Sequence, residues 1–388
     1  MASATVTNPV VTKKAIPLEI AGWIPYWRKA TGTQETLLHM YDFKEISPFG
    51  FTVKNDGTIF DALKIEEEPW PLLFTAARAQ KVKIFPTITW ANGVAIDTVL
   101  RSPTKRAAHV KQIVELVQKY NFDGIDIDYE GKKATTKPYF SLFLKELYKA
   151  MGKKFVSCTI EARTPLTSRY DTIPKDIAYA NDYTAVNAYC DRVRIMTYDQ
   201  GSIDIRLNAK AVGPYIPVSD PAWVEKVITL ASKTISKKKI FIGIPTYGYE
   251  YEVKELTEGY RYDLLWAFNQ RYALDVASAF GITPYRNEAG ELHFIYTPTS
   301  TAPLSSMVTT DAALTNNDLL ATTSFASTTG GVAQQSQSPF RIVWWSDASA
   351  IQDKIDLAKK LGVRGVAIFK IDGGADPKMW NVLYGATH

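Results

Sequence analysis

The chain has 388 residues, 46% of them hydrophobic and 22% charged, which excludes a disordered or collagen-like protein. Its 45 basic and 40 acidic side chains are spread along the sequence and leave a net charge of +5, so nucleic-acid binding is not expected. No run approaches the roughly 18 consecutive apolar residues of a membrane span, so none is predicted.

The first 17 residues are predicted to form a flexible arm. Its segment MASATVTNPVVTKK lacks the apolar core of a signal peptide, and it fits the mature end left after removal of a leader. We expect a secreted or cell-envelope protein, while a cytoplasmic start is also compatible with the sequence.

Short runs rich in β-branched and aromatic residues follow along the chain and predict eight strands. They are EIAGWIPYW (19–27), EISPFGFTV (45–53), KIFPTITW (83–90), GIDIDYE (124–130), FVSCTIEA (155–162), VRIMTYD (193–199), KIFIGIPTYG (239–248) and RGVAIFKI (364–371). Most are almost continuously apolar, as expected for parallel strands that are covered on both faces.

Segments with helical periodicity lie between these strands, for example over 105–119, 137–151 and 348–361. Eight strand-then-helix units predict an α/β fold, a closed (β/α)8 TIM barrel. A doubly wound open sheet is the competing architecture, but no G-x-G-x-x-G motif follows the first strand.

The region after the seventh strand breaks the alternation and is predicted to be a small α+β insertion over 251–340. We expect a helix over 262–280 and an antiparallel strand over 290–297, followed by a Ser/Thr-rich mobile loop over 298–338. The catalytic barrel would then comprise 18–250 and 341–388.

The segment DGIDIDYE carries the strongest chemical signal. Side chains alternate along a strand, so Asp126, Asp128 and Glu130 share one face, about 6.6 Å apart. One buried aspartate is easily explained as a structural bridge, but three acids in register are not. Such carboxyls cannot all ionise cheaply, so at least one pKa should rise. Glu130, nearest the carboxyl end of the strand, is the expected proton donor.

This segment resembles the DGxDxDxE signature of family 18 glycoside hydrolases, which have the chitinase-like fold, and all five fixed positions match. Met196-Thr197-Tyr198-Asp199 is similar to the M-x-Y-D element on that family's sixth strand. The resemblance covers roughly 18–388. It is strongest to the bacterial branch that includes spore-cortex and peptidoglycan-type glucosaminidases.

The resemblance implies substrate-assisted hydrolysis. Glu130 would protonate the glycosidic oxygen and then activate water, while Asp128 would orient the substrate's own 2-acetamido group, whose carbonyl oxygen attacks the anomeric carbon. Asp126 would tune Asp128, Tyr198 would hydrogen-bond the acetamido oxygen, and Asp199 would assist. The route requires an N-acetyl sugar on the non-reducing side of the cleaved bond.

Two elements differ from the family pattern. The S-x-G-G of the third strand is replaced here by Thr87-Ile88-Thr89-Trp90, and the tryptophan of the eighth strand corresponds to Phe369. A phenylalanine can still stack on a pyranose ring, but with less area.

Substrate-binding residues are expected where strands end at the carboxyl face of the barrel. These candidates are Trp23, Tyr26, Trp27, Trp90, Met196, Tyr247 and Phe369. For the aromatic members, packing beneath loops is the alternative. Glu161 is another polar strand end, for which a salt bridge to Arg163 or Arg194 is favoured over contact with sugar. One of Trp344 and Trp345 is expected in the core.

Cys158 and Cys190 allow one disulfide at most, and two buried thiols are favoured because Cys158 lies in the middle of a strand. The four histidines are scattered, so no metal site is predicted, and no cofactor is implied.

The favoured function is a retaining glycoside hydrolase that cleaves β-1,4 bonds of an N-acetylglucosamine-containing polysaccharide, either chitin, chitooligosaccharides or peptidoglycan. A non-catalytic glycan-binding lectin on the same fold and an endo-acting enzyme on N-glycans are the alternatives. We expect a monomer whose only partner is the polysaccharide.

Overall fold

A computed structural model of the chain describes residues 17–298 and 339–388. Eight parallel strands form a closed barrel, because β1 pairs with both β2 and β15. The strands are β1 (Glu19–Pro25), β2 (Glu45–Val53), β5 (Thr87–Trp90), β6 (Gly124–Tyr129), β7 (Phe155–Glu161), β8 (Arg192–Met196), β9 (Ile240–Pro245) and β15 (Gly365–Phe369). Two short strands, β3 (Ile59–Asp61) and β4 (Lys83–Ile84), also pair with β2. The predicted TIM barrel is confirmed.

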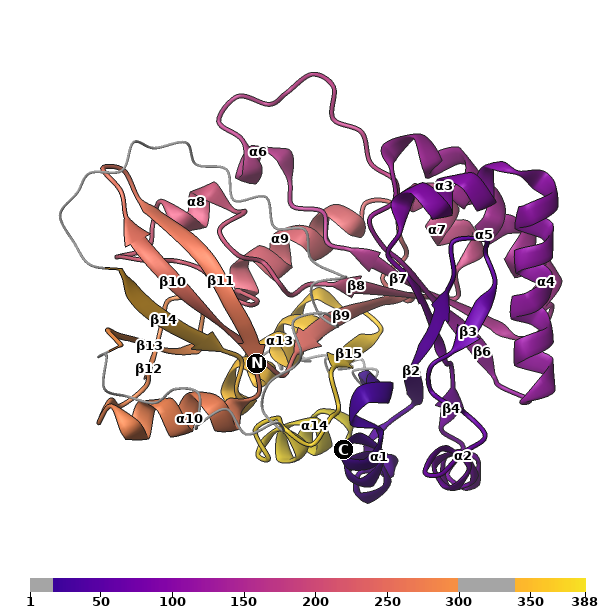
Figure 1. Cartoon of the computed structure of the whole chain (residues 1–388), viewed down its shortest axis with the longest axis horizontal. Helices are drawn as coiled ribbons and strands as arrows, with labels where there is room; N and C mark the ends of the chain where they lie inside the picture. Colours follow the sequence, from indigo (N-terminus) through magenta and orange to yellow (C-terminus); the bar gives the residue numbers. More distant parts are fainter. Residues whose placement is uncertain (1–16, 299–338) are drawn as a thin grey trace, which may run out of the picture.

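Helices lie between the strands, and the longer ones cover the outside of the barrel (Figure 1). They are α1 (Lys29–Leu38), α2 (Trp70–Ala79), α3 (Gly93–Arg101), α4 (Pro103–Lys119), α5 (Lys137–Met151), α6 (Leu166–Arg169), α7 (Tyr183–Tyr189), α8 (Ile205–Asn208), α9 (Pro221–Ala231), α13 (Ala348–Leu361) and α14 (Met379–Thr387). The 3-10 turns of the described segments are η1 (Tyr26–Arg28), η2 (Met40–Asp42) and η3 (Ala134–Thr136). No described helix has the length and apolar character needed to span a membrane.

The outward faces of the strands pack on the apolar stripes of these helices. Ile125 and Ile127 of β6, for example, belong to the same buried cluster as Phe143 and Leu147 of α5. The period of two in β6 therefore places its apolar side chains against the helices and leaves the alternate positions for the barrel interior.

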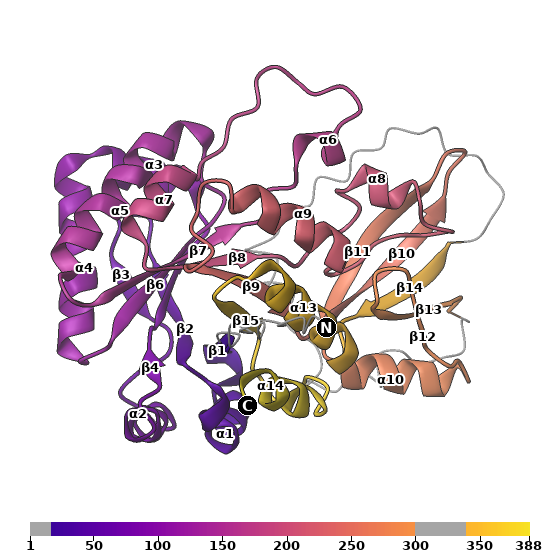
Figure 2. The same cartoon turned by 180° about the vertical axis from the view of Figure 1, so that it is seen from behind.

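A second, antiparallel sheet follows β9. Its strands are β10 (Gly248–Glu255), β11 (Tyr260–Phe268), β12 (Tyr285–Arg286), β13 (Leu292–Tyr296) and β14 (Phe340–Trp345), in the order β11-β10-β14-β13-β12. Helix α10 (Gln270–Ala279) packs on one face of this sheet. In Figures 1 and 2 the sheet lies at one end of the molecule, and α3, α4 and α5 lie at the opposite end.

The helix predicted over 262–280 is wrong in its first half, since β11 occupies 260–268 and α10 begins at Gln270. Pairing with β10 along the length of the strand overrides the helical spacing of its apolar residues. The strand predicted over 290–297 is confirmed as β13. The predicted mobile loop lies, apart from Pro298, outside the described residues, and the division into barrel and insertion stays a prediction.

Trp344 and Trp345 of β14 are both buried, not one of the two as predicted. They point to opposite faces of the antiparallel sheet, Trp344 toward Tyr249 and Trp345 toward Phe268 and Tyr272. Both faces of this strand are therefore covered.

The expectation of two free thiols is wrong, because Cys158 and Cys190 form a disulfide with a Cα–Cα distance of 5.9 Å. Cys158 does lie within β7, but Cys190 follows α7 just before β8, the strand that pairs with β7. Neighbouring parallel strands thus bring together two cysteines that are 32 positions apart in the sequence.

Candidate active site

The three acids of β6 line the barrel interior. Asp126 is 0%, Asp128 3% and Glu130 5% exposed. In register, Asp126 lies beside Thr87 of β5, and Asp128 lies between Thr89 of β5 and Thr159 of β7. We call Asp126, Asp128 and Glu130 the acid ladder. Threonine hydroxyl side chains therefore lie beside its two lower members, Asp126 and Asp128.

Asp126 is the lowest acid, and both of its carboxyl oxygens accept hydrogen bonds. Its Oδ2 accepts hydrogen bonds from Nε1 of Trp23 (3.0 Å), Oγ1 of Thr87 (2.8 Å) and a guanidinium nitrogen of Arg194 (3.3 Å). Its Oδ1 accepts a hydrogen bond from Oγ1 of Thr159 at 3.0 Å. Thr87 therefore supplies a hydroxyl where the family pattern has serine.

Asp128 is the middle acid, and unlike Asp126 it has a carboxyl oxygen that accepts no hydrogen bond. Its Oδ1 is buried without a hydrogen-bond partner. Burial raises the pKa of Asp128 well above its usual value, and the charges of Asp126 and Glu161 raise it further. Lys132 and a hydrogen bond with Thr89 act in the opposite direction. The protonated form of Asp128 is thereby favoured.

Glu130 follows β6 directly, and its backbone N–H donates to the carbonyl of Trp90 at 2.9 Å. Burial is the main cause that raises the pKa of its carboxyl well above the usual value, followed by the charges of Asp128 and Glu161, while Lys132 lowers it. A carboxylic acid that stays protonated near neutral pH can act as a general acid.

Lys132 and Glu161 form an ion pair beside these two acids, with 3.4 Å between Nζ and Oε1. The salt bridge predicted from Glu161 to Arg163 or Arg194 is therefore wrong. Arg163 instead lies between the rings of Tyr179 and Tyr183, 3.7 and 4.1 Å from their centroids. Sequence reasoning overlooked Lys132, although its position two residues after Glu130 was visible.

Tyr198 and Asp199 follow β8 and lie close to the acids of β6. Asp199 has a φ of +56°, and its Oδ1 accepts hydrogen bonds from the hydroxyls of Tyr247 and Tyr249, both at 2.6 Å. Burial raises the pKa of Asp199 to about 6, although the two tyrosines lower it. Burial also raises the pKa of Tyr198, which keeps its hydroxyl available as a donor.

Phe369 ends β15 at the centre of an aromatic group. Its ring is stacked on Tyr198 (5.4 Å, 15° between planes) and meets Trp23, Phe49 and Tyr247 edge-on at 5.8 to 6.0 Å. The position where the family pattern has tryptophan thus still presents an aromatic ring beside the acids.

The other predicted binding residues divide into two sets. Trp27 and Met196 are partly buried and pack against the cluster that contains Tyr198 and Tyr247. Tyr247 is fully buried and reaches the site through its hydrogen bond to Asp199.

Tyr26 and Trp90 both pack against the core between barrel and helices. Tyr26 also meets the ring of Trp27 edge-on, with 5.1 Å between the ring centroids. Trp90 is 3% exposed and packs on Tyr129 and His109 in the same core. A residue at the end of a strand can point to either face, and a substrate-binding role of Tyr26 and Trp90 stays a prediction.

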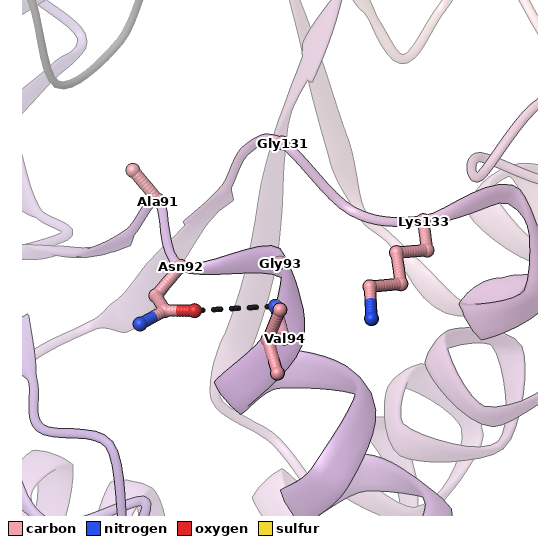
Figure 3. A pocket seen from close by; sticks show the side chains of 6 residues that line it. All are labelled: Ala91, Asn92, Gly93, Val94, Gly131 and Lys133. Atoms are coloured by element: carbon pink, nitrogen blue, oxygen red, sulfur yellow. Dashed lines mark hydrogen bonds between the residues drawn. The ribbon is translucent and has the colours of Figure 1, made fainter.

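A hollow of about 600 Å³ opens at the loops that follow β5 and β6, next to Glu130 in the chain. Figure 3 shows its lining, Ala91, Asn92, Gly93, Val94, Gly131 and Lys133. Asn92 caps α3 by accepting a hydrogen bond from the N–H of Val94 at 3.2 Å. None of these residues was predicted as a site residue. Across 17–298 and 339–388, no group of three or more His, Cys, Asp or Glu side chains could hold a metal ion.

Comparison with known proteins gives the family. The profile of glycosyl hydrolases family 18 matches residues 23–374, and the chain belongs to this family. Among curated proteins, "Uncharacterized glycosylase YvbX" of Bacillus subtilis is 22% identical over 320 residues, which cover 81% of this chain and 77% of that protein.

Solved structures share the fold at low identity. The spore cortex-lytic enzyme SleL of Bacillus cereus has a TM-score of 0.70 at 19% identity, over 97% of this chain and 75% of that one. The chitinase-like agglutinin of Robinia pseudoacacia has a TM-score of 0.64 at 14% identity, over 95% and 99% of the two chains. At these identities the likeness concerns the fold.

Proposed function

We propose that the chain is a retaining glycoside hydrolase that cleaves β-1,4 bonds of chitin, chitooligosaccharides or peptidoglycan glycan by substrate-assisted catalysis. The observation that carries the proposal is the buried Asp128–Glu130 pair. Burial raises the pKa of both carboxyls, the charge of Asp126 raises that of Asp128 further, and the charge of Asp128 raises that of Glu130 further. A site of this kind can hold the proton that a leaving glycosidic oxygen needs.

The roles follow the order of the ladder. Glu130, at the mouth, protonates the glycosidic oxygen and later takes a proton from the attacking water. Asp128, one step below, holds the N–H of the substrate's 2-acetamido group so that its carbonyl oxygen attacks the anomeric carbon. Tyr198 donates to that oxygen, and Asp199 and Phe369 help to shape the subsite.

Family membership and the names of its relatives favour an extracellular or cell-envelope polysaccharide as substrate. SleL is described as a spore cortex-lytic enzyme, and YvbX as a glycosylase. We infer from these relatives that the chain acts on N-acetylglucosamine-containing glycan outside the cytoplasm.

A lectin is the second candidate, and the agglutinin among the structural neighbours is the observation that favours it. The two candidates differ in whether Glu130 donates a proton during a reaction or only lines a binding groove. Binding to chitin without release of reducing ends would support the lectin.

The test is hydrolysis of a panel of chitin oligomers, peptidoglycan and a glycoprotein. Glu130→Gln should lower turnover by about 10²-fold or more, the scale of lost acid catalysis, while binding is retained. Glu115→Gln, on the exposed side of α4, removes a carboxylate outside the site and serves as the control. Full activity of Glu130→Gln on every substrate that the unmodified chain cleaves would refute the proposal.

A further inference from the structure

The carboxyl end of β7 brings a further glutamate to the mouth of the barrel. Asp128 of β6 pairs in register with Thr159 of β7. Glu130 and Glu161 each lie two positions further along, so they come to the same face at the same level. The Glu161 side chain is 38% exposed, whereas Glu130 is 5% exposed. A bound glycan can therefore reach Glu161 beside the proposed proton donor.

Two buried donors hold the Glu161 carboxylate. Nδ2 of Asn181 donates to Oε2 at 2.6 Å, and Nζ of Lys132 lies 3.4 Å from Oε1 and 3.5 Å from Oε2. The Lys132 side chain is 0% exposed and Asn181 is 8% exposed. Because a carboxylate has about four acceptor positions, these two donors leave it able to accept further hydrogen bonds from the open side.

Asn181 is itself fixed by an arginine that contacts two aromatic rings. Arg163 begins and Asn181 nearly ends the loop that leads from β7 through α6 to α7 (Figure 1). A guanidinium nitrogen of Arg163 donates to the backbone carbonyl of Asn181 at 2.8 Å. The guanidinium carbon lies 3.7 Å from the ring centroid of Tyr179 and 4.1 Å from that of Tyr183. The two ends of the loop are thereby tied together, and the amide that meets Glu161 is held in place before any ligand binds.

This arrangement suits the recognition of hydroxyl groups. A sugar ring presents hydroxyls as donors, and a hydrogen bond to an ionised carboxylate is about twice as strong as one between neutral groups. In the proposed reaction, Asp128 and Tyr198 contact the acetamido sugar, and Glu130 protonates the oxygen that joins this sugar to the next one. Glu161 lies beside Glu130 and one step above Asp128, so the next sugar is the unit within its reach.

We propose that Glu161 is a specificity-determining residue that accepts hydrogen bonds from hydroxyl groups of the leaving-group sugar, which lies on the reducing side of the cleaved bond. Asn181 is the positioning residue that orients the Glu161 carboxylate toward this sugar. The inference deepens the proposed function and rests on it, because it assigns a partner to the departing part of the glycan.

The first test measures binding at the leaving-group position alone. The thiazoline of N,N′-diacetylchitobiose is a stable analogue of the cyclised acetamido sugar and ends at the anomeric carbon, so a chain saturated with it keeps the leaving-group position open. N,N′-Diacetylchitobiose is then titrated into this complex, and its Kd is measured by NMR. Glu161→Ala should raise this Kd about tenfold or more, the scale of one hydrogen bond to a charged group, and should leave the Kd of the thiazoline unchanged.

Glu225→Ala is the matched control. The Glu225 side chain is 39% exposed and ion-paired to Lys360 at 2.8 Å, so it resembles Glu161 in exposure and in its partner, but it lies on α9 outside the barrel. This variant should bind both ligands as the unmodified chain does. Asn181→Ala removes the orienting donor, so it should raise the Kd of the disaccharide by less than Glu161→Ala does, and should leave that of the thiazoline unchanged.

Hydrolysis gives the second readout. An N-acetylated β-1,4 tetramer places a sugar at the leaving-group position, whereas 4-nitrophenyl chitobioside places 4-nitrophenol there, which has no sugar hydroxyls for Glu161 to hold. The ratio of kcat/KM for the two substrates should fall about tenfold in Glu161→Ala and stay unchanged in Glu225→Ala. A weaker proton donor would also lower this ratio, since 4-nitrophenol needs little protonation to leave, and the binding measurement separates the two causes.

An unchanged Kd of the disaccharide in a folded Glu161→Ala, or an equal loss of affinity for the thiazoline, would overturn the inference. If Glu161→Ala does not fold, Glu161→Gln takes its place. It keeps the length of the side chain and loses the charge, so the Kd of the disaccharide should still rise, by a smaller factor, and an unchanged Kd would again overturn the inference. If the unmodified chain cleaves neither substrate, the proposed function fails and this inference fails with it.

Discussion

Lys132 and Glu161 form an ion pair whose two charges act in opposite directions on the same buried acids. The pair spans 3.4 Å, and the Lys132 side chain is 0% exposed whereas that of Glu161 is 38% exposed. Lys132 lowers the pKa of both Asp128 and Glu130, and Glu161 raises it. The net effect of the pair on the pKa of Glu130, the proposed proton donor, therefore depends on both partners.

Removal of Lys132 and removal of Glu161 should shift the pH profile of hydrolysis in opposite directions. Lys132→Met should raise the pKa of Glu130, so the alkaline limb of the kcat/KM profile should move to higher pH. Glu161→Gln should move the same limb to lower pH, and the double variant should return close to the original profile. Equal shifts in the same direction, measured on one chitooligosaccharide, would contradict this role.

Burial of Asp199 makes stability depend on pH. Its pKa is raised from 3.8 to about 6 in the folded chain, so its stabilising contribution is complete below about pH 4 and is lost as the pH rises through 6. Asp199→Asn removes this loss. Thermal unfolding should therefore show the variant gaining stability relative to the unmodified chain between about pH 4.5 and 7.5, by roughly 2 kcal/mol.

Asp347 provides the matched control for that experiment. Burial acts to raise the pKa of Asp347, but hydrogen bonds from Arg286 and from the N–H of Ala350, together with the charge of Arg286, lower it overall. Asp347 therefore stays charged at both ends of that pH range. Asp347→Asn should destabilise the chain by a similar amount at both. If Asp199→Asn behaves in the same way, the buried charge of Asp199 does not control the pH dependence.

Phe369 should contribute to substrate binding through its ring. Phe369→Ala should lower kcat/KM by about tenfold, since an aromatic contact is worth roughly 0.5–1.5 kcal/mol beyond its buried area. Phe60, whose side chain is exposed on β3, gives the control Phe60→Ala. Unfolding midpoints measured in parallel separate lost binding from lost stability, and an unchanged kcat/KM in a folded Phe369→Ala would remove Phe369 from the site.

The disulfide should stabilise the chain without taking part in the reaction. Cys158→Ala with Cys190→Ala should lower the free energy of unfolding by about 2–4 kcal/mol, as expected for closing a loop of this size. Denaturant unfolding measures the loss. A double variant as stable as the unmodified chain would show that packing alone holds β7 against β8.

The acid ladder was predictable because it is local. A period of two along β6 is enough to place Asp126, Asp128 and Glu130 on one face, and the surrounding apolar runs identify that strand as part of a barrel. The same local logic located Phe369 and Tyr198 at strand ends.

The partners of the ladder were less accessible because they are brought together by closure of the barrel. Arg194 and Glu45 lie 149 positions apart, and their contact exists because β8 and β2 face each other across the interior. The orientation of Trp90 and the strand character of β11 likewise depend on neighbouring strands. Sequence periodicity gives no access to such contacts.

The most direct test of substrate-assisted hydrolysis at the Asp128–Glu130 pair is the anomeric configuration of the first product, followed by proton NMR during cleavage of an N-acetylated β-1,4 oligomer. The β-anomer should form first, and the fully deacetylated oligomer should remain uncleaved. Initial release of the α-anomer, or equal cleavage of the deacetylated oligomer, would contradict the proposed mechanism.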